Sequence, residues 1–542
     1  MGVGLREQYG AFNTALQSLY DDDTLLLAER EKTFEFDDAV FDEAVRRVYD
    51  LQGFDAEKLA DPAIRELITE TARILGAAID KGLVGTLGSS VRGSESKSAP
   101  QELPAPTGSV EHEVPETLRY ALENNAFTFS GFKTFHCMRE VGLSLTNDEG
   151  HIKPFAEFLT DVKKINARYN HHYLEAEYNH AVAASQMASR WYDFEQDGDD
   201  YNLQYRTAGD DRVREDHAVL HDTTLPPSDP FWDKYFPPNG WNCRCTVVQV
   251  RKEKYPVSDP ALAMLRGDNC TDGEKKKIFR YNPGKSLELF PPKHPYYKAP
   301  KDAKPVIKKV SAEEIRKNRI NEIIAELPNN LTSQEKQAIA ENCLELEKAL
   351  GITKGKPMSV DEADKQSANP KFGKQGYNIN CQTCSPAYLL RTRGFNLWAT
   401  NKPKSKIVAY EVWENIDGTK ATFIHTNKWM QDKGYKMMTP QRYKQFFNEC
   451  CKEVGIYEIM ITWKGGNRHA TNLQRFETGE LRYIEPQVDN SKGSQREGRT
   501  LGWLCRNLTT KPYVYKGFLD DGVMRIDNKI FDTSFYESFE TK

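Results

Sequence analysis

Apolar residues in the first 200 positions recur at the spacing of α-helices. Phe41, Val45 and Val48 lie three or four residues apart, which places them on one face of a helix. The same spacing continues from Val162 to Trp191 and predicts one long amphipathic helix, which the polar turn Asp197-Gly-Asp-Asp200 closes. The pattern therefore predicts a mostly helical N-terminal region.

Two stretches interrupt this pattern with residues that favour loops. Residues from Gly82 to about Glu113 are rich in Gly, Ser, Pro and Glu, which predicts a linker. The stretch Pro283 to Lys309 is rich in Pro and Lys, and we interpret it as an extended polar tether between domains. A helical pair is expected over residues 311–350, with Ser311 and Thr332 as the two N-caps.

Short apolar runs and prolines over residues 201–250 predict a small α+β unit that ends in a strand within Cys243–Val250. Further along, Tyr457–Trp463, His469–Phe476 and Leu481–Gln487 have the composition of three neighbouring strands, the first two joined by a Gly-Gly turn. The expected fold class is therefore multidomain α+β. Its expected segments are 1–114, 115–282, 283–356 with the tether and helical pair, and 357–542.

Composition narrows the class of protein. A chain of 542 residues and 62.0 kDa is expected to form about three domains. The net charge of −5 gives no overall preference for nucleic acid. The lysines at Lys275–Lys277 and from Lys301 to Lys309 are candidates for nonspecific contact with DNA, and the alternative is an ordinary solvated surface. Neither a membrane-spanning run nor an N-terminal signal segment is recognisable, so synthesis in the cytosol is expected.

Ten cysteines in so long a chain do not resemble a secreted disulfide framework, which leaves metal binding, catalysis or burial as their roles. His217 and His221 are four residues apart, so both rings project from one face if the segment is helical. With Cys243 and Cys245 they form a set suited to tetrahedral zinc, a structural ion in this interpretation. The alternative is a hydrogen-bonded histidine beside buried cysteines.

This region resembles a known family. The sequence Thr207, Asp211, Arg214 and His217, followed by a proline-rich loop and Asn242-Cys-Arg-Cys245, is similar to the Mu F-like minor head (head-morphogenesis) proteins of tailed phages. The resemblance covers about residues 115–250. It implies a virion protein located in the phage head, with portal and capsid proteins as partners. Relatives often carry unrelated toxin or enzyme domains at their C-terminal ends.

A second group of residues supplies a thiol, an imidazole and a carboxylate in chain order. Cys381 stands at an expected helix start, where the helix dipole favours a thiolate. His469 and Glu485 stand on adjacent expected strands, so the base and the group that orients it can meet. The pattern predicts a cysteine nucleophile with a general base.

Several alternatives stay open for this group. Cys384 is an alternative nucleophile, and the Cys-x-x-Cys pair is also compatible with a redox or zinc role. His425 is an alternative base. The third residue of the group, Glu485, also has two alternatives, Gln487 and Asp489. We include Gln487 among the candidate catalytic residues.

The order Asn380-Cys381, then Gly465-Gly-Asn-Arg-His469, then Glu485-Pro-Gln487 resembles the papain-fold toxin domains of bacterial and phage polymorphic toxins, over about residues 360–535. Relatives usually have Asp where this chain has Glu485. The resemblance implies a papain-like α+β domain in which Cys381, His469 and Glu485 form the catalytic triad. It also implies deamidation of glutamine in a host protein after delivery to the bacterial cytoplasm. The competing functions are a purely structural head protein with an inactive C-terminal domain and a peptidase that processes capsid proteins.

Overall fold

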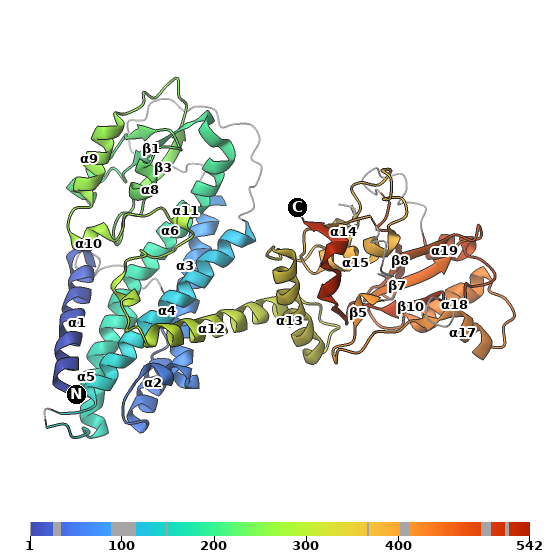
Figure 1. The fold of residues 1–542 in the computed structure, drawn as a ribbon, viewed down its shortest axis with the longest axis horizontal. Coiled ribbons are helices and arrows are strands. Elements are labelled where there is room, and N and C mark those ends of the chain that lie inside the picture. Colours follow the sequence, from blue (N-terminus) through green and yellow to red (C-terminus); the bar gives the residue numbers. More distant parts are fainter. Residues whose placement is uncertain are drawn as a thin grey trace. The chain divides into compact units, whose positions relative to one another are not determined.

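The computed structural model describes residues 2–24, 34–87, 115–147, 149–365, 368–401, 411–488, 500–514 and 520–541. The chain divides into two compact units, Met1–Arg316 and Lys317–Lys542. Helices and several separate sheets occur along it, so the predicted mixture of α and β structure is confirmed (Figure 1). Across the described ranges, no helix has the length and apolar content of a membrane span.

The N-terminal unit is built on long helices, as the apolar spacing predicted. These are α1 (Gly2–Thr24), α2 (Asp38–Asp50), α3 (Pro62–Leu87), α4 (Glu116–Ser144), α5 (Phe155–Asn166) and α6 (Leu174–Asp197). Helix α3 packs along both α4 and α6, and Phe41, Val45 and Val48 on α2 are buried in the same core. The single helix predicted from Val162 to Trp191 is instead α5 and α6 joined by a π-helical turn, Ala167–Tyr173.

A three-stranded antiparallel sheet follows α6, in the order β2-β1-β3. Its strands are β1 (Asn202–Arg206), β2 (Thr224–Leu225) and β3 (Thr246–Val250). Short helices accompany the sheet: α7 (Glu215–Ala218), α8 (Phe231–Tyr235), α9 (Pro260–Cys270) and α10 (Glu274–Lys277). This small α+β unit and its final strand are confirmed, and Figure 1 shows it at one end of the long helices.

The stretch Pro283–Lys309 is not an extended tether. It forms α11 (Pro283–Ser286), a 3₁₀ turn (Pro295–Tyr297) and the start of α12 (Ala303–Glu326). Phe290 and Tyr296 are buried in the N-terminal core, and the Phe290 ring stacks on Phe129 at a centroid distance of 3.8 Å. The prediction failed because it counted the prolines and lysines but gave no weight to the aromatic residues between them, which bury apolar surface.

The C-terminal unit contains a five-stranded antiparallel sheet in the order β6-β10-β7-β8-β9. Its strands are β6 (Ile424–His425), β10 (Gly522–Arg525), β7 (Gly455–Thr462), β8 (Arg468–Arg475) and β9 (Leu481–Ile484). Two short ladders pair β5 (Trp413–Glu414) with β11 (Ile530–Phe531) and β4 (Leu397–Ala399) with β12 (Phe539–Thr541). The three neighbouring strands predicted from the sequence are β7, β8 and β9.

Helices complete this unit: α13 (Ser333–Leu350), α14 (Val360–Lys365), α15 (Cys381–Thr392), α17 (Thr426–Asp432), α18 (Pro440–Cys450) and α19 (Leu501–Asn507). Thr332 caps α13 through a capping box with Glu335, as predicted. Ser311 does not cap a helix, because it lies buried inside α12. Ile339 and Leu346 of α13 belong to the same core as residues of α15, so α13 is part of this unit and the segment 283–356 is not separate.

The predicted linker also begins later than expected. Residues 82–87 continue helix α3, and residues 88–113 lie outside the described ranges. Gly82 sits where an added Cβ would come within 2.5 Å of the backbone oxygen of Val182. This glycine therefore serves close packing of α3 against α6 and does not mark a loop.

Candidate functional site

The three candidate catalytic residues come from three elements of the C-terminal unit. Cys381 is the first residue of α15 and is partly buried. His469 lies near the start of β8, and Glu485 directly follows β9. Helix α15 packs against β8, and β8 pairs with β9. Tertiary structure therefore brings the thiol, the imidazole and the carboxylate together.

Glu485 holds the imidazole by a direct hydrogen bond. The Nε2 atom of His469 donates to Oε2 of Glu485 at 2.8 Å. The Tyr483 hydroxyl donates to the same oxygen at 2.6 Å, and the backbone N–H of Gln487 donates to the other oxygen at 3.3 Å. Since Nε2 is engaged, Nδ1 is the ring nitrogen that remains to exchange a proton with the thiol of Cys381.

The electrostatics of the site favour a thiolate. Burial opposes ionisation of Cys381, but its hydrogen bond with His469 and the charge of that imidazole lower its pKa. Burial disfavours the protonated form of His469, yet the Glu485 charge and hydrogen bonds to Cys381 and Glu485 raise its pKa to about 10. Burial raises the pKa of Cys384 well above that of an ordinary thiol. Of the two thiols, Cys381 is therefore the one whose surroundings favour the thiolate.

A cluster of buried amides ties the nucleophile to the segment that carries the acid. The side-chain amide of Asn369 donates to the backbone carbonyl of Gln487 at 2.9 Å and to Oδ1 of Asn380 at 3.1 Å. The Gln487 side chain donates to the same Asn380 oxygen at 3.4 Å. Gln487 thus bonds to the residue before Cys381, and its side chain does not take the place of Glu485 beside the imidazole.

Aromatic rings cover the other side of the histidine. The Trp463 indole stacks on the His469 ring at a centroid distance of 5.8 Å, and Trp503 packs edge-on against Trp463. Such rings shield the bond between His469 and Glu485 from water, which strengthens it. Sequence reasoning gave no role to Trp463 or Tyr483. Strand alternation contained a signal for Tyr483, because residues two apart on a strand point to the same face and Glu485 is two residues further on.

The sequence also offered His425 as the base and Asp489 as the third residue. His425 lies on β6, three positions from β8 in the sheet, and at the usual strand spacing this is about 14 Å from His469. It is therefore not the base for Cys381. Asp489 lies outside the described residues.

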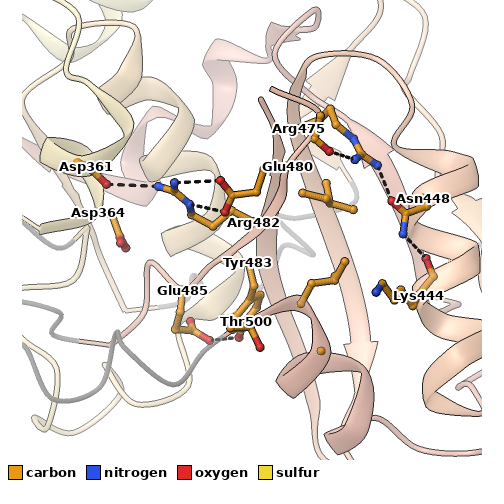
Figure 2. A pocket seen from close by; sticks show the side chains of 14 residues that line it. Asp361, Asp364, Lys444, Asn448, Arg475, Glu480, Arg482, Tyr483, Glu485 and Thr500 are labelled. Carbon is orange, nitrogen blue, oxygen red and sulfur yellow. Dashed lines mark hydrogen bonds and ion pairs between the residues drawn. The ribbon is translucent and has the colours of Figure 1, made fainter. Parts of the chain in front are cut away.

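A cavity of about 550 Å³ lies beside β9 and meets the triad at its carboxylate end. Figure 2 shows Glu485 and Tyr483 on its wall, with the ion pairs of Arg482 to Asp361 and Glu480 nearby. Its lining includes neither Cys381 nor His469. The cavity therefore has charged residues in its lining and contacts Glu485, but it does not expose the Cys381 thiol to a substrate.

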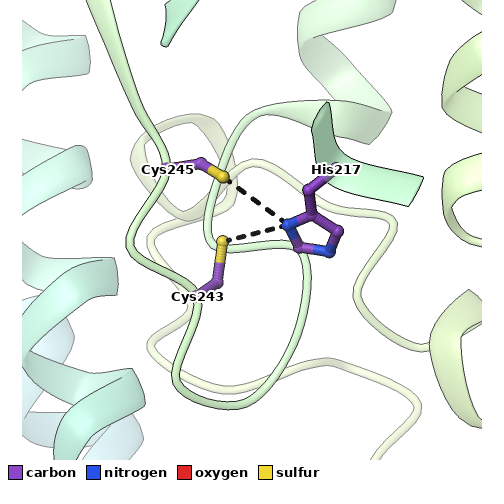
Figure 3. A group of neighbouring side chains, drawn as sticks. All are labelled: His217, Cys243 and Cys245. Atoms are coloured by element: carbon purple, nitrogen blue, oxygen red, sulfur yellow. Dashed lines mark hydrogen bonds between the residues drawn. The ribbon is translucent and has the colours of Figure 1, made fainter. Parts of the chain in front are cut away.

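A second cluster occurs in the N-terminal unit, where His217 lies on α7 and Cys243 and Cys245 lie on the loop that enters β3. Both sulfur atoms face the same ring nitrogen: Nδ1 of His217 is 3.6 Å from Sγ of Cys243 and 3.5 Å from Sγ of Cys245 (Figure 3). All three residues are buried. These are three of the four metal ligands that the sequence predicted.

The fourth predicted ligand, His221, is not part of the cluster. Its Nδ1 is 2.8 Å from the Thr207 hydroxyl and accepts the Thr207 backbone N–H at 3.1 Å, and its side chain is 38% exposed. The prediction failed because α7 ends at Ala218, so the helix that would align the two rings does not reach His221. A cysteine that the sequence did not single out, Cys270, lies with Asp216 near His217 in a separate group of possible ligands.

The lysines proposed for DNA contact at Lys275–Lys277 are partly engaged within the chain. Lys276 forms an ion pair with Asp216, and Lys277 lies 3.8 Å from Asp272 and 3.7 Å from Glu274. Their charges are partly neutralised by these carboxylates, which weakens the case for a DNA-binding patch here.

Comparison with known proteins shows that the segment containing His217, Cys243 and Cys245 matches a known family. The family described as "Phage Mu protein F like protein" matches residues 152–248. The "Putative capsid assembly protein F" of Escherichia phage Mu is 39% identical over 84 residues, which cover 14% of this chain and 19% of that protein. The "Mu-like prophage FluMu F protein" of Haemophilus influenzae is 37% identical over 74 residues, which cover 14% of this chain and 17% of that protein.

The chain thus spans about a fifth of the length of the curated relatives that it matches. No solved structure matches it. The matched stretch contains α5, α6, β1, His217 and the Cys243-x-Cys245 loop. Residues 152–248 are thus similar to the Phage Mu protein F like family.

Proposed function

We propose that this chain is a phage head protein that also carries a cysteine hydrolase. The head assignment rests on the match of residues 152–248 to Mu F-like proteins, one of which is named for capsid assembly. Its partners are then portal and capsid proteins, and its location is the virion head. The enzymatic assignment rests on one observation: the Cys381 thiol, the His469 imidazole and the Glu485 carboxylate meet in the order that a cysteine hydrolase needs.

The chemistry follows from this order. The Cys381 thiolate attacks the carbonyl carbon of an amide and forms a C–S bond. Protonated His469 gives its proton to the departing nitrogen as the C–N bond breaks, which leaves a thioester. Water then attacks the thioester while His469 takes its proton, and the thiolate is released with a carboxylic acid. Glu485 keeps the imidazole in orientation and stabilises its charged form.

Helix α15 supplies the remaining element. Cys381 and Gln382 are its first two residues, so their backbone N–H groups have no acceptor within the helix. Such N–H groups at a helix start stabilise the negative oxygen of a tetrahedral intermediate. The nucleophile and its oxyanion donors are therefore contributed by the same turn.

The substrate we favour is the side-chain amide of glutamine in a host protein, so that the departing nitrogen leaves as ammonia. This choice rests on the resemblance of the segment 360–535 to papain-fold toxin domains. A peptidase uses the same residues on a backbone amide, so the two activities differ in product and not in mechanism. In a purely structural head protein, neither product forms.

A growth experiment separates the enzyme from the scaffold. The full chain is expressed in a bacterial host as wild type and as Cys381→Ala, with Cys384→Ala as the matched control three residues along the same helix. Toxicity that is lost with Cys381 and retained with Cys384 supports the hydrolase. Equal growth of wild type and Cys381→Ala contradicts it.

The reaction product shows whether the enzyme acts on a glutamine side-chain amide or on a backbone amide. Host proteins isolated after expression are compared by mass spectrometry with those from the Cys381→Ala strain. A glutamine converted to glutamate supports deamidation. New peptide termini in place of this change indicate a peptidase and overturn the substrate assignment.

A further inference from the structure

The cluster of His217, Cys243 and Cys245 belongs to the N-terminal unit and has no part in the hydrolase mechanism. Its three ligand atoms converge on one point, since both sulfur atoms lie 3.5–3.6 Å from a single ring nitrogen. In tetrahedral zinc sites the metal lies about 2.0 Å from nitrogen and about 2.3 Å from sulfur, which separates the two ligand atoms by about 3.5 Å. The three atoms are thus spaced as the ligands of one ion.

Hydrogen bonds alone do not give both thiols a partner at the His217 ring nitrogen. A ring nitrogen carries either one hydrogen or one lone pair, so Nδ1 of His217 makes one good hydrogen bond and not two. Yet both thiols are directed at it, and all three groups are buried. A cation at the centre satisfies the three atoms at once. Two thiolates also balance the charge of a divalent ion, so the buried centre becomes neutral.

The two segments that carry the ligands are fixed by other contacts. Arg214, three residues before His217, donates to the backbone carbonyl of Trp241 at 2.6 Å. Arg244, between the two cysteines, forms two hydrogen bonds of 2.6 Å to the carboxylate of Asp210. Asn242 adopts a positive φ of 55°, which turns the chain just before the first cysteine. The loop and α7 therefore hold the ligands in place through protein contacts, so the site is preformed.

We propose that Nδ1 of His217 and the thiolates of Cys243 and Cys245 bind one Zn²⁺, with water as the fourth ligand. Imidazole and thiolate are ligands that zinc prefers. A cavity of about 260 Å³ that both cysteines line has room for this water. Asp216 and Cys270 have ligand atoms within 4.8 Å of a ring nitrogen of His217, and the proposal places both residues outside the ligand set.

Metal analysis of the full chain tests this proposal. Protein is stripped with a chelator, reloaded with zinc, freed of excess metal by gel filtration and analysed for elements. We expect about one zinc per chain in the wild type and in His221→Ala, and a loss of zinc in His217→Ala and Cys243→Ser. His221 is the matched control, because it is the nearby histidine that lies outside the cluster. Absence of bound zinc in the wild type, or its retention in His217→Ala, overturns the site.

Two further measurements test the ligands, and the first of them uses only wild-type protein. In wild-type protein, alkylation mapped by mass spectrometry is expected to reach Cys243 and Cys245 faster after chelation than before it. In the cobalt-substituted protein, the intensity of the thiolate charge-transfer band is expected to correspond to two thiolates and to be unchanged in Cys270→Ser. Equal alkylation with and without chelator contradicts metal binding. A band that weakens in Cys270→Ser contradicts the assigned ligands.

Discussion

The imidazole Nε2 of His469 lies 2.8 Å from a carboxylate oxygen of Glu485, and the hydroxyl of Tyr483 bonds to the same oxygen at 2.6 Å. The resemblance noted in the sequence implies an aspartate at the position of Glu485, and glutamate is longer by one methylene. The bonds from Tyr483 and from the Gln487 backbone hold this longer side chain in place. The longer side chain therefore still places a carboxylate oxygen in contact with the His469 imidazole.

Cys381 is expected to be the fastest of the ten cysteines to react with iodoacetamide near neutral pH. Its pKa is lowered by His469, so a larger fraction is thiolate at a pH where ordinary thiols are protonated. His469→Ala is expected to slow its alkylation, because the imidazole that favours the thiolate is removed. Mass spectrometry of tryptic peptides measures each site. His425→Ala is the control, and an equal effect of both substitutions contradicts the pairing.

Glu485→Gln is expected to lower turnover by roughly 10²- to 10⁴-fold, because the amide cannot stabilise a charged imidazole. Alkylation of Cys381 is expected to change less, since it needs neither the proton transfer to the departing nitrogen nor the one from water. Tyr483→Phe removes one hydrogen bond to the acid, which typically contributes about 1 kcal/mol, so its loss of turnover is expected to be smaller. Turnover is measured by release of ammonia from the substrate found in the host. A Glu485→Gln variant with wild-type turnover excludes this residue as the orienting acid.

The buried carboxyl of Glu458 is expected to make the stability of the C-terminal unit depend on pH. This carboxyl is buried on β7, where it accepts the Trp413 indole N–H at 2.8 Å, and burial raises its pKa to about 8. The unfolded value is about 4.3, so the folded state binds the extra proton between these values and stability falls as pH rises from about 4.3 to about 8. Glu458→Gln is therefore expected to melt at a higher temperature than wild type at pH 8.

The amide oxygen introduced by Glu458→Gln still accepts the indole N–H of Trp413, so packing is conserved in this variant. Exposed Glu480, mutated in the same way, is the control and is expected to leave the pH dependence of the melting temperature unchanged. If the melting temperatures of wild type and Glu458→Gln change equally with pH, the Glu458 carboxyl does not cause the pH dependence.

Limited proteolysis is expected to spare residues 283–301 in the folded protein. Phe290 is fully buried against Phe129, and its replacement by alanine is expected to destabilise the N-terminal unit by about 3–5 kcal/mol. Leu262→Ala, at a position that is 45% exposed, is expected to change stability by less than about 0.5 kcal/mol. Denaturant unfolding measures both. Rapid cleavage around Phe290 in the native state contradicts the packing.

The sequence determined the local elements of the candidate site. Apolar runs separated by glycine turns are enough to specify the meander of β7, β8 and β9, because alternation and turn chemistry act within a few residues. The start of α15 at Cys381 and the capping box at Thr332 are likewise local. These local signals were enough to name Cys381, His469 and Glu485 as candidate catalytic residues.

Tertiary structure decided which of these residues meet. His217 and His221 have the same chemistry and lie four residues apart, but only His217 lies with the cysteines, because α7 ends between them. Phe290 and Tyr296 are buried because partners such as Phe129, far away in sequence, cover them. Local patterns state what a segment prefers, whereas burial and ligand convergence depend on contacts between distant segments, and those contacts form only when the chain folds.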